Sequence, residues 1–302
     1  MSFVHLHTHS EFSLLDGASR ISDMVRLAAE TGMPAIALTD HGVLYGAIDL
    51  LTQAKLAGIK PIIGLEAYVA TRSRHQKEGR ADRDPYHLIL LVKDLTGYRN
   101  LITLSSRSHL EGYYYKPRID KALLAEHTEG LIALSSCLGG EVASRLLEAD
   151  EAGAEQAALE YQRMFGDDYF LEIQDHGMEE QARVNEGLAR IAQRTGIPLV
   201  ATNDSHYTRQ DDAEAHDILL CLQTGTVTSD QKRMRFQTTS SISRPRPKWP
   251  SASGTSRRRW RTRCGSRSAA PFSSIPGRCC RASRCRRGRR PRPTFADWPS
   301  RV

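Results

Sequence analysis

The chain has 302 residues and a formal charge of +7, but this charge is divided very unevenly along the sequence. Residues 1–237 carry 24 basic and 34 acidic side chains, so their balance is 24 − 34 = −10. Residues 238–302 carry 18 basic side chains and one acidic one, so their balance is 18 − 1 = +17. This division excludes a uniformly basic protein, and the overall isoelectric point is no guide to its partners.

Membrane and secreted classes are also disfavoured. The longest apolar runs, such as residues 87–92, are too short to cross a bilayer, and residues 1–4 do not begin a signal peptide. In residues 1–237 there are two cysteines, Cys137 and Cys221, which are too few for a disulfide framework. We therefore expect a cytoplasmic protein with no membrane partner.

Short apolar runs that end in polar residues predict β-strands, and amphipathic stretches between them predict helices. The predicted strands are residues 3–9, 35–41, 61–67, 87–93, 130–136, 169–175 and 198–206, and the predicted helices are residues 21–32, 46–58, 97–110, 140–166 and 179–196. Gly58 and Gly196 follow helices as C-caps should. This alternation predicts an α/β fold with a parallel sheet, either open or closed into a barrel.

Side chains that commonly bind metals cluster at the ends of the predicted strands. They are His7, His9, Asp40, His41, Glu66, Cys137, Asp204 and His206. Each one alone has an ordinary explanation, such as a hydrogen-bonded histidine, a turn-capping aspartate or a buried cysteine. Because the carboxyl ends of parallel strands meet at one rim, their recurrence there favours a metal site.

Several motifs carry a more specific resemblance. They are HLHTHSEFSLLDG (5–17), ALTDHGVLYGA (37–47), GLEAYVA (64–70), TGYRNL (96–101), EGYYYKPRID (111–120), LSSCLGGE (134–141) and ATNDSHY (201–207). Together they resemble the N-terminal polymerase-and-histidinol-phosphatase (PHP) domain of bacterial DNA polymerase III alpha subunits. FSLLDG, TGYRNL and KPRID favour this polymerase branch over free-standing histidinol phosphatases. The resemblance covers residues 3 to about 237.

The resemblance implies a distorted (β/α)7 TIM-like barrel of the PHP fold, and a metal site. The implied ligands are His7, His9, Asp16, His41, Glu66, His87, Cys137, Asp204 and His206. They would hold two or three divalent metal ions, with Zn, Mn or Fe favoured by the thiol and Mg as a further option. Only the resemblance identifies His87, because our strand assignment places it where a run begins. His5 and His176 match no ligand position.

The implied activity is metal-dependent phosphodiester hydrolysis, as a 3′–5′ exonuclease that proofreads DNA. We assign Asp40, Asp204 and His206 as catalytic, with Asp40 orienting the imidazole of His41. The implied partners are a DNA 3′ end, single-stranded or at a primer terminus, and the remaining polymerase and replisome subunits. The polymerase palm is absent from this chain, so we expect no nucleotide polymerisation.

Two other functions remain open. The domain could be a non-catalytic structural or interaction module of the polymerase, or a free-standing phosphoesterase resembling histidinol phosphatase. The loop at residues 72–85, with Arg72, Arg74, Lys77, Arg80 and Arg83, is either a DNA backbone contact or a solvated charged loop.

Residues 238–302 are rich in Arg, Ser and Pro and have no helical or strand period. One interpretation is a disordered basic arm that binds nucleic acid. We favour another, in which these residues are a frameshifted translation. When residues 238–302 are back-translated into DNA and the reading frame is moved by one base, suitable codon choices give a protein sequence that resembles the family's continuation. The predicted organisation is therefore a PHP domain at residues 1–237 and a disordered tail at residues 238–302.

Overall fold

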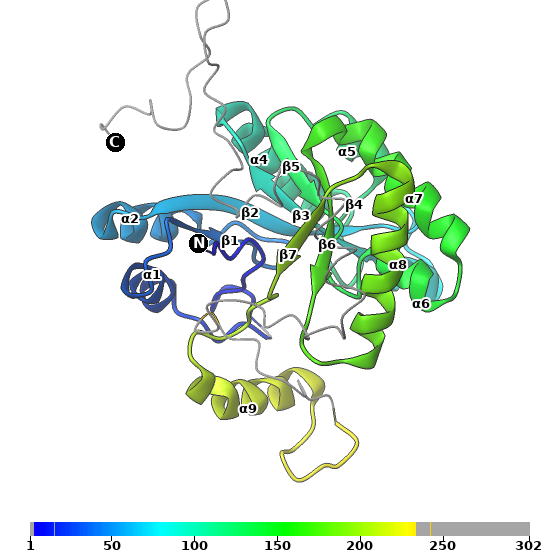
Figure 1. Ribbon diagram of the computed structural model, residues 1–302. Helices are drawn as coiled ribbons and strands as arrows, with labels where there is room; N and C mark the ends of the chain where they lie inside the picture. The colour runs from blue at the N-terminus through cyan, green and yellow to red at the C-terminus, as the bar shows by residue number, and fades with distance from the viewer. Residues whose placement is uncertain (1–2, 15, 234–241, 243–302) are drawn as a thin grey trace, which may run out of the picture.

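A computed structural model describes residues 3–14, 16–233 and 242, and shows a curled α/β sheet surrounded by helices (Figure 1). The strands are β1 (Ala35–Leu38), β2 (Lys60–Val69), β3 (Tyr86–Val92), β4 (Arg118–Ile119), β5 (Leu131–Leu134), β6 (Tyr169–Gln174) and β7 (Leu199–Thr202). Their order is β1-β2-β3-β5-β6-β7, and the short β4 pairs with β2. The predicted α/β class is confirmed.

The sheet is mixed, so the prediction of a parallel sheet is wrong for one strand. β3 runs antiparallel to both of its neighbours, β2 and β5, whereas the other pairs are parallel. The reason is the connection from β2, because residues 70–85 turn back directly instead of crossing over the sheet. The start of β3 therefore lies at the rim where the other strands end, and His87 is paired with Tyr68 near the end of β2.

Residues 3–9, predicted as the first strand, form an extended segment rather than a regular strand. On one side, the amides of Ala37 and Thr39 donate to the carbonyls of residues 5 and 8, both at 2.9 Å. The two donors are two residues apart in the chain whereas the two acceptors are three apart, so the segment has one extra residue, as in a β-bulge. On the other side, Ser205 exchanges backbone hydrogen bonds with residues 7 and 9, at 3.1 and 2.8 Å. The segment thus joins the two edges of the curled sheet, as expected of a distorted barrel.

Helices cover the sheet on its outer side (Figure 1). They are α1 (Ile21–Glu30), α2 (Ala47–Ala57), α3 (Gly79–Arg83), α4 (Leu95–Leu110), α5 (Lys121–Ala125), α6 (Glu141–Leu147), α7 (Glu151–Phe165), α8 (Glu179–Thr195) and α9 (Ala213–Thr224), with 3₁₀ turns η1 (Gly166–Asp168) and η2 (Gln210–Asp212). The predicted helix at 140–166 is two helices, because the Asp150 carboxylate accepts from the Gly153 amide and starts a new one. Gly58 and Gly196 are left-handed C-caps, at φ 68° and 77°, as predicted.

The core lies between the sheet and these helices, and includes buried Leu65, Leu90 and Leu171. A separate apolar cluster between α1 and α2 also contains Ile242, whose amide donates to the Tyr207 carbonyl at 3.2 Å. Ile242 falls in the predicted tail, and the remaining predictions for residues 238–302 lie outside the described residues. No helix in the described ranges is long and apolar enough to cross a membrane.

Candidate metal centre

The nine predicted metal ligands come from different elements and meet at one rim of the sheet. Three groups have ligand atoms that all lie within 4.8 Å of one another. The groups are His9 with His41 and His206, His7 with His9 and Glu66, and Glu66 with His87 and Cys137. Because His9 and Glu66 each belong to two groups, the three form one continuous cluster.

Glu66 in β2 lies at the centre of this cluster and is 1% exposed. Its Oε1 is 2.8 Å from Nδ1 of His87 and 3.5 Å from Nε2 of His7. Its Oε2 is 2.6 Å from Nδ1 of His41 and 3.5 Å from Nε2 of His9. The Cys137 thiol completes this side, with Sγ 3.8 Å from Nδ1 of His87. One buried carboxylate therefore faces four imidazoles.

Two further carboxylates close the cluster. Asp204 follows β7, and its Oδ1 is 3.2 Å from Nε2 of His7 and 3.3 Å from Nε2 of His9. Its backbone has φ 45°, a left-handed conformation that a non-glycine residue adopts at an energetic cost and that is common at functional sites. Asp16 lies near the outside, with Oδ2 3.0 Å from Nε2 of His41.

The donor atoms fit a divalent metal. Nε2 of His7 and His9, Nδ1 of His41, Oε2 of Glu66 and Oδ1 of Asp204 are buried and form imidazole–carboxylate contacts of 2.6–3.5 Å without aligned hydrogen bonds among the described residues. So many buried nitrogen and oxygen atoms gathered without aligned hydrogen bonds are unusual in a folded protein and require an explanation. Imidazole, carboxylate and thiolate are common ligands of Zn, Fe and Mn, and a bound cation would satisfy all five atoms.

The pKa values in this cluster reflect its crowding. Burial opposes protonation of His41, but Glu66 and Asp16 raise its pKa to about 10. Burial, together with the neighbouring His41 and His206, lowers the pKa of His9 to about 3. Against the effect of burial, nearby histidines hold the pKa of Glu66 well below its usual value. Carboxylates and protonated imidazoles therefore neutralise each other in the metal-free site.

His7 and Cys137 respond to the same carboxylates. Burial would lower the pKa of His7, but Asp204 and Glu172 raise it well above its usual value. Burial and the carboxylates of Asp204 and Glu66 raise the pKa of the Cys137 thiol well above its usual value. Without a metal, Cys137 is therefore unsuited to act as a nucleophilic thiolate.

Glu172 in β6 was missed by the sequence analysis. Its Oε1 lies 2.7 Å from Nδ1 of His7, and Gln174 and Thr202 donate to the same oxygen. Glu172 therefore holds the His7 ring with Nε2 directed at Glu66 and Asp204. The signal was a carboxylate in the middle of a predicted buried strand, where a glutamate requires a partner.

Asp40 bonds to residues of the preceding segment instead of to the adjoining imidazole of His41. Its carboxylate accepts from the Ser10 amide at 2.7 Å, the Ser10 hydroxyl at 2.8 Å and the Ser13 hydroxyl at 2.9 Å. No described hydrogen bond joins it to the imidazole of His41. Ser13 Oγ is instead 3.1 Å from Nδ1 of His9. Asp40 thus supports His9 through Ser13, because the chain folds residues 10–13 over the end of β1.

The remaining histidines behave as expected. His5 and His176 belong to none of the three groups found among the described residues. Nε2 of His5 is 3.2 Å from the Ile242 carbonyl, and Nε2 of His176 is 2.6 Å from the Asn203 carbonyl. Both side chains therefore support the backbone around the site.

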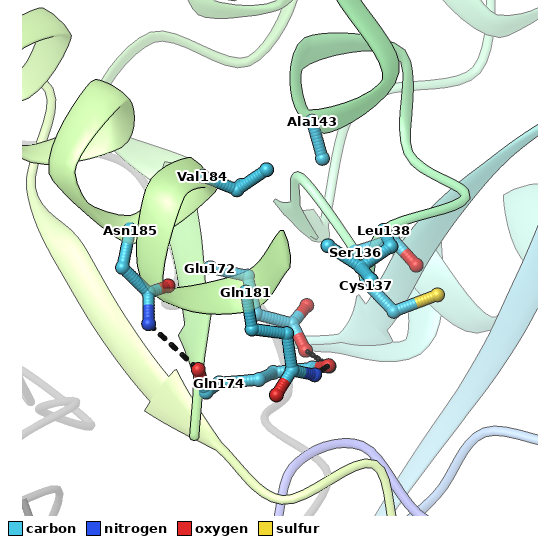
Figure 2. A pocket seen from close by; sticks show the side chains of 9 residues that line it. All are labelled: Ser136, Cys137, Leu138, Ala143, Glu172, Gln174, Gln181, Val184 and Asn185. Atoms are coloured by element: carbon cyan, nitrogen blue, oxygen red, sulfur yellow. Dashed lines mark hydrogen bonds between the residues drawn. The ribbon is translucent and has the colours of Figure 1, made fainter. Parts of the chain in front are cut away.

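A small pocket, partly open to solvent, adjoins the cluster beside Cys137 (Figure 2). Glu172 and Gln174 line it together with Gln181 and Asn185 of α8. These polar groups bond one another, since Asn185 donates to the Gln174 carbonyl at 2.7 Å and the Gln174 side chain donates to Glu172 at 2.9 Å. The pocket therefore contains the network that supports His7.

Comparison with known proteins identifies related sequences. The sequence model of the PHP domain matches residues 5–176. The DNA polymerase III subunit alpha of Treponema pallidum is 52% identical over 240 residues, covering 79% of this chain and 20% of that protein. The Thermus aquaticus subunit is 49% identical over 240 residues, covering 78% and 20%. The chain thus spans about a fifth of the length of these curated relatives.

Among solved structures, a histidinol phosphate phosphatase from Lactococcus lactis, complexed with zinc, L-histidinol and phosphate, is 16% identical. Its TM-score is 0.35, and the match covers 75% of this chain and 95% of that one. An amidohydrolase from Chromobacterium violaceum is also 16% identical, with a TM-score of 0.39, and covers 68% and 87%.

Proposed function

Because the chain belongs to the PHP domain family and is homologous to the N-terminal part of DNA polymerase III alpha subunits, we propose that it hydrolyses phosphodiester bonds. The predicted resemblance is thereby confirmed. The observation that supports the proposal most strongly is the gathering of five buried imidazole nitrogens and carboxylate oxygens that contact one another without aligned hydrogen bonds. A free-standing phosphatase is not a better reading of the chain, because the curated relatives are polymerase subunits.

The ligands in this proposal are the nine residues His7, His9, Asp16, His41, Glu66, His87, Cys137, Asp204 and His206. The three overlapping groups would suit two or three divalent ions, and the thiol and imidazoles favour Zn, Mn or Fe. When bound, such ions stabilise negative charge on phosphate oxygens and lower the pKa of water.

Exposure indicates the side from which a substrate would approach. His7, His9 and Glu66 are buried, at 0%, 0% and 1% exposure, and form the floor of the site. The side chains of His41 and His87 are 16% and 19% exposed. The scissile phosphate would therefore approach over these two rings.

The protein groups have distinct roles in this proposal. Asp204 and His206, with side chains 14% and 5% exposed, lie at the edge of the floor and would contact the reacting group. Glu172 orients His7, and Asp40 orients His9 through Ser13. Asp40 is therefore a positioning residue, because its bonds to residues 10–13 keep it from the open side.

The substrate we propose is a DNA 3′ end, single-stranded or at a primer terminus, cleaved in the 3′–5′ direction. The relatives' shared name supports this choice, since proofreading requires such a nuclease beside a polymerase. Replisome subunits would then be the protein partners of an intact relative.

The test measures nucleotide release from a 3′-labelled oligonucleotide with Mn²⁺ or Zn²⁺, and bound metal per purified chain. We expect metal-dependent release that a His7→Ala, Asp204→Ala double variant abolishes. A matched control changes the exposed His75 and Asp167 to alanine and should keep full activity. Release unchanged in the double variant would exclude this site as its source. Absence of bound metal from the wild-type chain would favour a structural module instead.

A further inference from the structure

Two tyrosines on the turn before β4 are exposed instead of packed in the core. Tyr113 and Tyr115 are 54% and 64% exposed. The ring of Tyr115 is held at its edge by Tyr114, with centroids 4.8 Å apart and planes at 81°. A flat aromatic ring that is both exposed and braced is suited to stacking against a planar ligand.

One cation adjoins the Tyr115 ring, and a second lies over the neighbouring Tyr68. Arg83 places its guanidinium 5.1 Å from the centre of the Tyr115 ring, and Lys116 places its ammonium 4.5 Å from that of Tyr68. Neither has a carboxylate within 4.0 Å in the part of the chain that is described. Residues 1–237 have a balance of −10, and at this surface Arg83 and Lys116 leave positive charge that no described carboxylate within 4.0 Å neutralises.

The other arginines predicted to contact DNA are already paired. Arg72 bonds Asp82, Arg74 bonds Glu111 and Asp120, and Arg80 bonds Asp84. Internal carboxylates thus neutralise most of the loop at 72–85. Arg83 differs from them because its guanidinium contacts an aromatic ring instead of a carboxylate, so it is the better candidate for a phosphate.

Lys116 connects this surface to the metal centre. Tyr68, below its ammonium, lies two residues after Glu66 in β2. The Tyr68 ring is stacked 5.9 Å from the ring of His41 at 16°, and it lies edge-on to His87 at 5.1 Å. These are the two imidazoles on the open side of the cluster, so the Lys116 ammonium lies beside the proposed entrance for a phosphate.

The turn is fixed in a strained conformation. Tyr115 has φ 60°, in the left-handed region that bulky side chains rarely adopt, and its exposure leaves little packing to compensate. Arg118, which is fully buried, fixes the backbone around this turn. Its guanidinium donates to the carbonyls of Gly112, Asp82 and Gln76 at 2.9, 2.6 and 2.8 Å. Strain kept at an exposed ring is typical of a binding site.

We propose that Arg83, Tyr113, Tyr115 and Lys116 form a binding surface for a single-stranded polynucleotide that leads to the metal centre. Bases would stack on the two tyrosines, Lys116 would hold the phosphate next to the centre, and Arg83 would hold a phosphate farther out. The inference rests on the proposed phosphodiester hydrolysis and identifies the substrate as a polymer instead of a small phosphate ester.

The experiment is photo-crosslinking of the full chain to a 5-iododeoxyuridine oligonucleotide in EDTA, with the crosslinked residues identified by mass spectrometry. EDTA removes hydrolysis from the readout, and locating the crosslink separates this surface from residues 238–302. We expect crosslinks at Tyr113 or Tyr115 and none at Tyr45, a matched control that is 63% exposed near α2. A single deoxynucleotide should compete poorly with the oligonucleotide.

Lys116→Gln and Arg83→Gln should each reduce the crosslink at least about fivefold, the loss expected for one phosphate or stacking contact. Their melting temperatures should match the wild type because neither side chain is buried. Crosslinks only elsewhere, or unaffected by both variants, would overturn the inference even if the chain hydrolyses DNA. Crosslinks at this surface without any hydrolysis would retain it and refute the proposed activity instead.

Discussion

Replacing Glu172 with glutamine tests whether a carboxylate outside the ligand set controls metal binding. Glu172 Oε1 lies 2.7 Å from Nδ1 of His7, and both side chains are fully buried. Glutamine has nearly the same shape but no charge, so the change removes the charge-assisted part of this hydrogen bond. Such bonds are about twice as strong as neutral ones, which corresponds to a loss of about 1–1.5 kcal/mol.

We therefore expect Glu172→Gln to weaken Mn²⁺ or Zn²⁺ binding about tenfold. This is near the lower end of the loss of metal affinity expected when a carboxylate that orients a metal-binding histidine is replaced. Titration calorimetry on the full chain would measure it. In a His7→Ala background the same change should have no further effect, because the ring that Glu172 orients is gone.

Thr202→Val is the matched control. Thr202 donates to the same oxygen of Glu172 but does not contact His7, so its loss should weaken metal binding much less. An unchanged metal affinity in Glu172→Gln would refute the reasoning. An equal loss in Thr202→Val, or additive losses with His7→Ala, would assign the effect to general packing of β6 against β7.

Three further predictions follow from the geometry. Because neighbouring carboxylates raise the pKa of His41 to about 10 and also raise that of His7, both are protonated near pH 7 and must deprotonate to bind metal. Metal binding should then release these two protons and a third from the Cys137 thiol, whose pKa is also raised, and affinity should rise between pH 6 and 8 by up to about tenfold per proton per pH unit. Calorimetry in buffers of different ionisation enthalpy measures this release, and none would contradict it. Arg118→Met should lower the free energy of unfolding by about 2–4 kcal/mol, because several backbone carbonyls lose their buried donor. Urea titrations measure this loss, and a value below about 1 kcal/mol would contradict the role of Arg118 as the donor that holds these carbonyls. Gly97→Ala should destabilise the fold by more than about 2 kcal/mol in the same assay, since its Cβ would lie 1.8 Å from the carbonyl oxygen of Gly130, and full stability would show that α4 can shift.

The approximate positions of most strands were predictable because their signals are local. An apolar run followed by histidine or an acidic residue is visible in a few residues, and that pattern singled out His7, His9, His41 and Glu66 from the sequence. The helix C-caps at Gly58 and Gly196 were predictable for the same reason, since a left-handed residue after a helix favours glycine.

Other features depend on contacts between residues far apart in the chain. The direction of β3 is decided by how residues 70–85 return to the sheet, and this direction brings His87 to the rim. Glu172 and His7 are 165 positions apart, so no local pattern pairs them. Asp40 adjoins His41 in sequence, yet its oxygens bond to Ser10 and Ser13.

The sequence by itself determined which side chains could bind a metal and at which strand ends they stand. Only the tertiary structure decided which ring nitrogen faces which oxygen, because hydrogen-bond partners are chosen by packing between strands. It also separated the paired arginines of the loop at 72–85 from Arg83, since pairing depends on carboxylates such as Asp120 that come from elsewhere in the fold.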